Sequence, residues 1–328
     1  MVHDPIEPHA HGWLVRPGGH RVYWEASGNP DGLPAIYLHG GPGSGLGRGG
    51  YRRRFDPDRY RIIGIDQRGC GKSTPLAVES LETLDANTTQ ALLADLEAVR
   101  DELGIETWLL HGVSWGSTLA LAYALDHPDR VTGVVLTAVT SGSREEIDWI
   151  TQGVGAIFPE AWARFRAGAP GEERVVDAYA RLLRDADPAV RSAAARAWEE
   201  WESTHVSLDP GWVPGPMFDD DLERQNFATL VTHYWAHDCF LRGPARIRHR
   251  IAELAGVPGV LIHGRHDVSG PAITPWLLHQ AWPGSELVVV ESEGHGGPRE
   301  MELTCDAIGR LADELGPRAH PSGGARHR

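Results

Sequence analysis

The sequence predicts an α/β fold, in which helices flank a mostly parallel central sheet and a separate helical segment is inserted. Short apolar runs alternate with longer helical patterns between residues 34 and 139, and the alternation resumes after residue 257. Such alternation is typical of βαβ units and a parallel sheet. Between the two parts, residues 141–241 contain no convincing buried strand but many Ala, Arg and Glu residues at helical spacing.

The individual elements follow in order along the chain. We expect buried strands at residues 35–38, 62–65, 108–110 and 134–136, and two further strands at 257–262 and 287–290. Apolar residues recur at helical spacing over 88–103, with Asn87 as the expected N-cap. A closing helix is expected over 304–315.

These elements divide the chain into four predicted segments: the first part of the core at residues 1–140, a helical cap at 141–241, the second part of the core at 242–315, and a flexible tail at 316–328. An insert in this position can lie over the carboxyl ends of the strands, where ligands bind in open α/β folds. We interpret the tryptophans of the cap mainly as helix-packing residues: Trp149, Trp162, Trp198, Trp201, Trp212 and Trp235.

The composition excludes several classes of protein. The 328 residues include 31 Lys+Arg and 45 Asp+Glu, and the resulting net charge of −14 argues against a nucleic-acid partner. Three cysteines are too few for a disulfide framework or a metal cluster. No apolar leader is visible, and no run reaches the ~18 apolar residues that span a bilayer. We therefore expect a cytoplasmic protein with no membrane partner; its oligomeric state is left open.

The stretch Gly112-Val113-Ser114-Trp115-Gly116 fits the pattern G-x-S-x-G, with an apolar strand before it and a helix of small residues after it. This context is that of a nucleophile elbow, a strained strand-to-helix turn that exposes a reactive serine. Ser114 is therefore the predicted nucleophile.

A serine hydroxyl needs a histidine base, which a carboxylate orients in turn. In folds with this elbow the acid and then the histidine follow the serine, each on a loop after a strand. Asp267 and His295 occupy those places, so we predict a triad of Ser114, Asp267 and His295. His263 and His266 are rival bases, but they lie on the strand and loop of the acid itself.

Acyl transfer also needs hydrogen-bond donors where negative charge develops on the carbonyl oxygen. The glycine-rich segment His39 to Gly43 follows the first buried strand. We assign the oxyanion hole to the backbone N–H groups of Gly41 and Trp115.

Two other motifs are rejected. Gly71-Lys72-Ser73 is similar to the end of a phosphate loop, but Asp66 stands where that motif requires its first glycine. The pair His9 and His11 lacks the spacing and carboxylates of a metal site. We expect no metal and no cofactor.

Several stretches give the chain a resemblance to the proline iminopeptidase (prolyl aminopeptidase) family of α/β hydrolases, from about residue 13 to 315. Those most specific to the family are Asp66-Gln67-Arg68-Gly69-Cys70-Gly71 and Ser114-Trp115-Gly116-Ser117-Thr118-Leu119-Ala120-Leu121. The resemblance implies an α/β-hydrolase fold, an acyl-enzyme mechanism, and a helical cap that selects substrates by a free N-terminal proline.

The resemblance also implies which residues meet the substrate. Trp198-Glu199-Glu200-Trp201-Glu202 is similar to the family's Trp-x-x-Trp-Glu, which places Glu202 at the substrate amine. At other substrate positions the chain departs from the family: Val231 replaces a second glutamate, Thr137 an arginine, Thr140 an aromatic residue and Thr151 a tyrosine. Asp238 is a candidate for the missing charge.

The leading hypothesis is a serine hydrolase that releases N-terminal proline, or a similar small residue, from peptides or amides. The departures at the substrate positions motivate an alternative, a family member repurposed as an amide or ester hydrolase on a non-proline substrate, for example in a biosynthetic pathway. A third hypothesis, a non-catalytic ligand-binding protein on the same fold, is opposed by the complete order of serine, acid and histidine.

Overall fold

A computed structural model describes residues 1–208 and 211–315 of the chain. Its centre is a sheet of eight strands in the order β1-β2-β4-β3-β5-β6-β7-β8. The pairs β1–β2 and β2–β4 are antiparallel and all other neighbours are parallel. The strands are β1 (Ala10–Arg16), β2 (His20–Gly28), β3 (Leu33–Leu38), β4 (Tyr60–Asp66), β5 (Trp108–Val113), β6 (Val131–Thr137), β7 (Gly259–Gly264) and β8 (Ser285–Val290).

Helices cover both faces of this sheet, and a helical insert lies between β6 and β7 in the sequence. The helices of the core are α1 (Thr89–Glu102), α2 (Trp115–Asp126), α8 (Ile247–Arg250), α9 (Ile273–Ala281) and α10 (Pro298–Leu315). Those of the insert are α3 (Arg144–Thr151), α4 (Pro159–Gly168), α5 (Val175–Leu182), α6 (Pro188–His205) and α7 (Asp221–Ala236).

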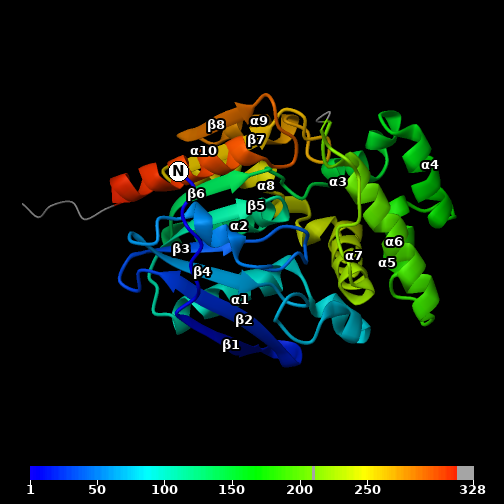
Figure 1. Cartoon of the computed structure of the whole chain (residues 1–328), viewed down its shortest axis with the longest axis horizontal. Helices are drawn as coiled ribbons and strands as arrows, with labels where there is room; N and C mark the ends of the chain where they lie inside the picture. Colours follow the sequence, from blue (N-terminus) through cyan, green and yellow to red (C-terminus); the bar gives the residue numbers. More distant parts are fainter. Residues whose placement is uncertain (209–210, 316–328) are drawn as a thin grey trace, which may run out of the picture.

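The core forms because the parallel strands bury side chains on both faces. One face packs against α1, α2 and α9 through residues such as Leu96, Leu119 and Leu278. The other packs against α10 and the short helix at Gly50–Arg54 through residues such as Tyr51 and Ile308. Figure 1 shows the sheet in one half of the molecule and the insert in the other, beyond one end of the strands.

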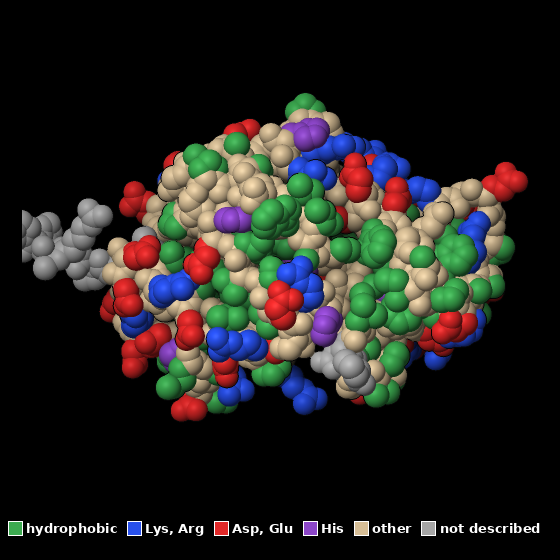
Figure 2. Space-filling view, turned by 90° about the horizontal axis from the view of Figure 1, so that it is seen from above, with side chains coloured by type: hydrophobic (Ala, Val, Ile, Leu, Met, Phe, Trp, Pro, Cys, Tyr) green, Lys and Arg blue, Asp and Glu red, His purple; other side chains and the backbone are tan. Residues whose placement is uncertain are grey.

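Acidic and basic side chains are interspersed over most of the face seen in Figure 2, with hydrophobic side chains between them. Within the described residues, no helix combines the length and the apolar character that crossing a bilayer requires.

The fold class and the predicted strands of the parallel sheet are confirmed, and three details differ. The antiparallel strands β1 and β2 were not predicted; side chains of β1 are alternately half-buried and exposed, so no continuous apolar run marks it. Thr88, rather than Asn87, caps α1, because its side chain accepts a hydrogen bond from the backbone N–H of Ala91. The closing helix begins at Pro298, six residues before Thr304. The predicted tail at 316–328 lies outside the described residues.

Candidate active site

Ser114 occupies a strained turn between β5 and α2. Its φ is 57° and its ψ is −125°, a conformation that costs free energy for any residue with a side chain. The surrounding structure holds the turn: the backbone N–H of Ser114 donates to Thr137 O at 3.0 Å, and Ser114 O accepts from the backbone N–H of Ser117 at 2.7 Å. The strain directs the serine side chain away from both the strand and the helix.

Two glycines permit this turn because other backbone lies against them. A Cβ on Gly112 would overlap the carbonyl oxygen of Gly116, and a Cβ on Gly116 would overlap the carbonyl oxygen of Leu38 in β3. The G-x-S-x-G pattern therefore reflects close packing of the first turn of α2 against the neighbouring strand.

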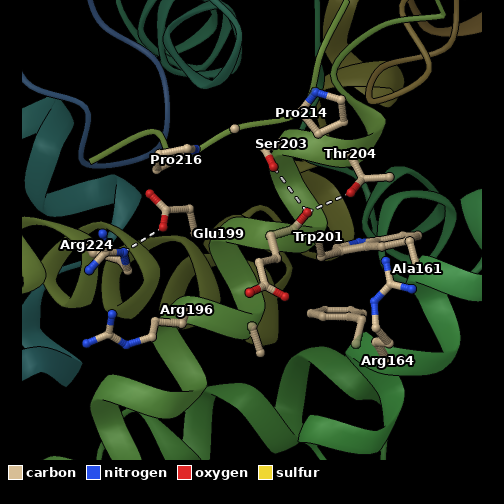
Figure 3. Close-up of a pocket in the computed structure, with 14 residues that line it drawn as sticks. Ala161, Arg164, Arg196, Glu199, Trp201, Ser203, Thr204, Pro214, Pro216 and Arg224 are labelled. Atoms are coloured by element: carbon tan, nitrogen blue, oxygen red, sulfur yellow. Dashed lines mark hydrogen bonds and ion pairs between the residues drawn. The ribbon is translucent and has the colours of Figure 1, made fainter. Parts of the chain in front are cut away.

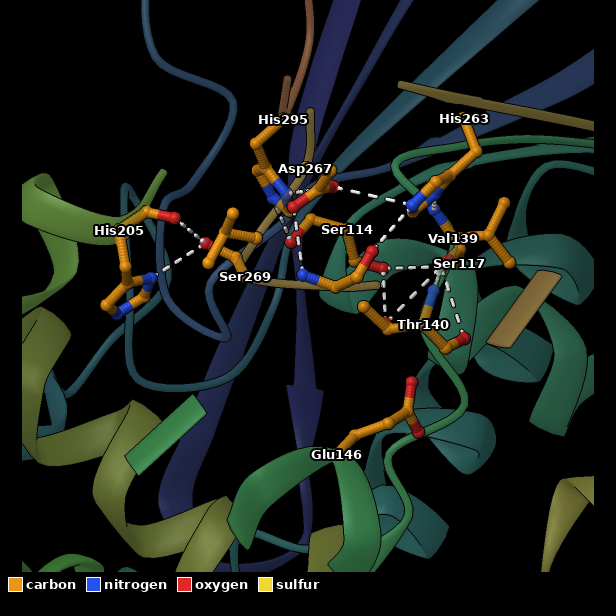
Figure 4. A network of polar contacts seen from close by, with 12 residues as sticks. Ser114, Ser117, Val139, Thr140, Glu146, His205, His263, Asp267, Ser269 and His295 are labelled. Carbon is orange, nitrogen blue, oxygen red and sulfur yellow. Dashed lines mark hydrogen bonds and ion pairs between the residues drawn. The ribbon is translucent and has the colours of Figure 1, made fainter. Parts of the chain in front are cut away.

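Ser114, His295 and Asp267 lie within hydrogen-bonding distance in series (Figure 4). Ser114 Oγ is 2.9 Å from His295 Nε2, and His295 Nδ1 is 2.7 Å from Asp267 Oδ2. They follow β5, β8 and β7, so three distant parts of the sequence meet at the carboxyl edge of the sheet. Such an arrangement can remove a proton from the serine hydroxyl during attack on a carbonyl.

His295 and Asp267 shift each other's pKa through their opposite charges. Burial lowers the pKa of His295, but the charge of Asp267 and its hydrogen bond outweigh burial and raise the pKa to about 9. Burial acts in the opposite direction on Asp267, yet His295 keeps the pKa of this carboxyl below its usual value. The carboxylate therefore remains ionised beside the imidazole. Asp267 Oδ1 also accepts from the backbone N–H of Gly270 at 2.8 Å.

His263, one of the rival bases, is engaged elsewhere. Its Nδ1 accepts from the backbone N–H of Val139 at 3.0 Å, and its Nε2 is 2.6 Å from Gly270 O (Figure 4). Both ring nitrogens are therefore occupied, and burial lowers the pKa of the ring. His263 braces the loop that carries Asp267.

The other rival, His266, lies in that same loop, where its backbone N–H donates to Glu293 O at 2.8 Å. Within the described residues, His266 makes no hydrogen bond to Ser114.

Gly41 and Trp115 line the same cavity as Ser114. Neither backbone N–H donates a hydrogen bond to another described residue. The N–H of Trp115 is at the start of α2, where the helix dipole favours negative charge. The indole Nε1 of Trp115 donates to Gln67 Oε1 at 2.8 Å, and Gln67 Nε2 donates to His39 O at 3.0 Å, which ties the elbow to the glycine-rich segment.

The cavity has a volume of about 330 Å³ and receives side chains from both the core and the insert. Its lining is largely apolar, which excludes water and strengthens electrostatic interactions inside. The insert contributes Glu146, Ile147, Ile150, Glu202, His205, Val206, Met217, Phe227 and Trp235.

Glu202 is the one charged residue of the predicted substrate positions that lies in this cavity wall. Trp198 Nε1 donates to Glu202 Oε1 at 2.7 Å, and no described residue donates to the other oxygen. Burial raises the pKa of Glu202 to about 7, against the opposing effects of Trp198 and His295. Burying the ionised carboxylate costs free energy, and a cation inside the cavity would offset that cost by pairing with it.

Thr140 also lines the cavity, but its hydroxyl is used internally. It donates to Ser114 O at 3.0 Å and lies 2.8 Å from Thr118 Oγ1, so it supports the elbow.

Three other predicted substrate residues are not in the cavity wall. Thr137 Oγ1 lies 3.0 Å from Thr304 Oγ1, because the side chain turns toward α10. Thr151 Oγ1 donates to Ile147 O one turn earlier in α3. Val231 is fully buried in α7, where Phe227 one turn earlier reaches the cavity instead.

Asp238 does not supply a second charge to the cavity. Its carboxylate makes ion pairs with Arg144 at 2.6 Å, Arg242 at 3.0 Å and Arg174 at 3.5 Å. The expectation that it replaces the missing glutamate is therefore wrong, because three guanidinium groups already neutralise it.

Several residues in the wall were missed from the sequence: His205, Glu146, Phe227 and Trp235. Glu146 could not be recognised as a cavity residue from the sequence, because its carboxylate has the ordinary role of a helix cap. Its carboxylate accepts from Ser141 and from the backbone N–H of Ser143, and this caps α3. Trp235 is only partly buried and lines the cavity, whereas Trp198 and Trp201 are fully buried. The position of each tryptophan around its helix decides which of these it does, and the residue type alone does not reveal it.

A second cavity of about 490 Å³ lies on the insert, between α4, α6 and residues 214–216 (Figure 3). Glu199 and Arg224 form an ion pair of 2.6 Å in its wall. Glu199 also accepts from the backbone N–H groups of Met217 and Phe218, so the pair holds this loop against α6 and α7. The lining contains neither Ser114 nor His295. Over the described residues, no group of His, Cys, Asp and Glu is placed to hold a metal ion.

Comparisons with known proteins bear on this arrangement. Residues 34–298 match the model of a family described as alpha/beta hydrolase fold. The chain is 47% identical over 300 residues to a probable proline iminopeptidase of Streptomyces coelicolor, covering 90% of this chain and 92% of that protein. It is 42% identical over 298 residues to a proline iminopeptidase of Arabidopsis thaliana, covering 90% of this chain and 77% of that protein.

Among solved structures, the proline iminopeptidase of Mycobacterium smegmatis has a TM-score of 0.62 at 22% identity, covering 93% of this chain and all of that chain. A likeness at this level of identity concerns the fold alone.

Proposed function

Because this chain belongs to the proline iminopeptidase family of α/β hydrolases, we propose that it is a serine hydrolase that releases N-terminal proline from peptides or amides. The observation that carries the proposal is that the hydrogen-bonded series of Ser114, His295 and Asp267 opens into the same cavity as the carboxylate of Glu202. A nucleophile and an amine-binding group thus share one apolar chamber.

The first half of the reaction transfers the prolyl group to the enzyme. Ser114 Oγ attacks the carbonyl carbon next to the scissile bond while His295 Nε2 takes its proton, and the N–H groups of Gly41 and Trp115 stabilise the oxyanion. His295 then gives the proton to the leaving amine as the C–N bond breaks. Asp267 stabilises the imidazolium throughout.

The second half releases the product. Water enters, His295 takes one of its protons, and the hydroxide attacks the acyl-enzyme ester. Collapse of the tetrahedral intermediate returns the proton from His295 to Ser114 Oγ and frees proline.

Substrate selection is assigned to the helical cap, residues 141–241. In its ionised form Glu202 binds the N-terminal ammonium, and the apolar wall that includes Ile150, Phe227 and Trp235 receives the pyrrolidine ring. An ammonium paired with a buried carboxylate contributes about 1.5 to 3 kcal/mol, which is about ten- to a hundredfold in affinity. We assign the enzyme to the cytoplasm, which accords with its three free and buried cysteines.

The alternative function, hydrolysis of a non-proline amide or ester, is favoured by one observation. Val231 is buried in α7 and Asp238 is neutralised, so Glu202 and Glu146 are the carboxylates of the described cavity wall, and Glu146 is used as a helix cap. Comparison of a proline arylamide with simple aryl esters separates the two functions. Activity on esters alone contradicts the prolyl function, and a strong preference for the proline arylamide contradicts the alternative.

The experiment that tests the chemistry is Ser114→Ala. We expect turnover of the proline arylamide to fall by at least about 10⁴-fold, with an unchanged melting temperature, because the methyl group fits where the hydroxymethyl was. A fluorophosphonate probe should label the wild-type protein and not the variant. Retained turnover in Ser114→Ala contradicts the proposal, and failure of the probe to label the wild type favours the non-catalytic hypothesis.

A further inference from the structure

His205 lies in the last turn of α6, three residues after Glu202, and its ring forms part of the wall of the active-site cavity. Residues at this spacing are neighbours on one face of a helix. The side chain is 2% exposed, and Trp201 packs edge-on against the ring at 5.1 Å between centroids. The orientation of the imidazole is therefore fixed.

Two hydrogen bonds to Ser269 determine which ring nitrogen carries the proton (Figure 4). Ser269 Oγ donates to His205 O at 3.0 Å, and His205 Nδ1 lies 2.8 Å from the same Oγ. A hydroxyl has one proton to give. Both bonds exist together only if Nδ1 carries a hydrogen and donates to Ser269, which leaves Nε2 with a bare lone pair.

That lone pair has no partner. His205 Nε2 is buried and makes no hydrogen bond within residues 1–208 and 211–315. Burial and the nearby charge of His295 lower the pKa of His205 to about 3, so the ring is neutral and Nε2 accepts hydrogen bonds at any ordinary pH. A buried acceptor without a donor costs free energy, and a ligand that supplies one recovers it.

We propose that His205 Nε2 is a specificity-determining acceptor, which takes one N–H of the substrate's N-terminal ammonium while Glu202 takes the other. The proposal rests on the proposed function, since it assumes that an amine-bearing residue occupies this cavity. Glu202 and His205 both stand in the last two turns of α6 and both line the cavity, and the charge of His295 lowers the pKa of both groups.

This pair of acceptors selects a chemical class of substrate. A secondary ammonium, as in N-terminal proline, has two N–H groups and satisfies both acceptors. A primary ammonium has three, so its third N–H is left without a partner in an apolar chamber, at a cost in free energy. A neutral imidazole also attracts the ammonium, whereas a cationic one would repel it.

The test compares His205→Leu and His205→Gln with wild-type enzyme on proline 4-nitroanilide and on 4-nitrophenyl acetate, which has no ammonium. We expect His205→Leu to lower kcat/KM for the anilide about ten- to a hundredfold, mainly through KM, because it loses one hydrogen bond to a charged group. The acetate should change by less than about twofold. His205→Gln offers an amide oxygen and should recover most of the loss. His249→Gln, an exposed histidine on α8, is the matched control and should change neither rate.

Equal losses on both substrates, no loss on either, or a His205→Gln variant no better than His205→Leu would overturn the assignment. A second measurement uses the wild type alone, in case a variant fails to fold. Prolinamide and N-methylprolinamide, which carry two and one N–H on the charged amine, are compared as inhibitors of acetate hydrolysis. We expect prolinamide to bind more tightly, and equal inhibition contradicts the proposal. Wild-type enzyme that leaves the anilide intact counts against the proposed function instead, while the inhibitor comparison still decides the role of His205.

Discussion

The backbone N–H of His295 donates a hydrogen bond to the carbonyl oxygen of Val206, 3.3 Å away. Val206 directly follows α6, so the end of the helix that carries Glu202 is joined to the loop that carries the proposed base. A second bond runs from the backbone N–H of Leu208 to His266 O at 3.1 Å, and reaches the loop of the acid. The proposed amine-binding groups and the proposed reacting groups are thus parts of one hydrogen-bonded unit.

Asp267→Asn tests the orientation of the base. Because Asp267 Oδ1 accepts the N–H of Gly270, the amide oxygen of asparagine would take that place and its NH₂ would face His295 Nδ1. The imidazole would then carry its proton on Nε2 and could not accept one from Ser114. We expect kcat for the proline arylamide to fall about 10⁴-fold with little change in stability. Asp129→Asn, at an exposed position, serves as the control. A decrease in kcat of less than about tenfold would contradict the proposed role.

The pH dependence of selectivity follows from Glu202. Its pKa is raised to about 7, so the carboxylate loses its charge, and its attraction for an ammonium, as the pH falls below that value. An ester without an ammonium does not need this charge, and both substrates share the titration of His295. The ratio of kcat/KM for arylamide and ester should therefore fall roughly tenfold between pH 8 and pH 6.

Glu202→Gln is the companion measurement, because an amide does not titrate. The ratio should be low and independent of pH in this variant. Parallel pH profiles for the two substrates in the wild type would show that Glu202 does not bind the amine.

Glu300 predicts a pH dependence of stability. Both of its oxygens are buried without a partner among the described residues, and burial raises its pKa to about 8 although His295 opposes the shift. Between pH 4.5 and 8 the unfolded chain loses this proton while the folded chain keeps it, so stability falls as the pH rises through this range. Glu300→Gln removes the effect, and should stabilise the protein more at pH 9 than at pH 5, by on the order of a few kcal/mol.

Thermal unfolding at the two pH values measures this difference. Glu302→Gln, two residues later on α10 and half-exposed, should show no such dependence. An equal effect of Glu300→Gln at both pH values would mean that the carboxyl is already ionised in the folded state.

Gly116 and Gly309 give opposite predictions for the same substitution within a helix. A methyl group on Gly116 overlaps the backbone of Leu38, so Gly116→Ala should destabilise the fold by about 1 to 3 kcal/mol and displace the elbow. Apart from its chain neighbours and the adjoining backbone of α10, no described atom lies within 4 Å of a Cβ on Gly309, so Gly309→Ala should stabilise α10 by about 0.5 to 1 kcal/mol. Urea denaturation measures both. Similar stabilities for the two variants would show that the contact with β3 relaxes freely.

The fold class and the positions of Ser114, Asp267 and His295 could be predicted because buried parallel strands leave continuous apolar runs, and reacting groups follow the strand ends. The faces of helices and strands were harder to predict. Thr137 and Val231 are placed by family resemblance at positions whose side chains turn into the protein, a matter of packing that one sequence does not specify. Nothing in the sequence indicates the proton position on His205, since Ser269 lies 64 residues away.

The position of α6 in the wall of the cavity that holds Ser114 also determines which peptide bonds the enzyme does not cleave. Trp198 lies one turn before Glu202 on α6, is fully buried, and donates from its Nε1 to Glu202 Oε1. A polypeptide that continued beyond Glu202 in this direction would collide with that indole. Peptide bonds in the middle of a chain therefore cannot reach Ser114. Such an enzyme would leave the folded proteins of its own cell intact and would cleave only at the free N-terminal ends of peptide fragments.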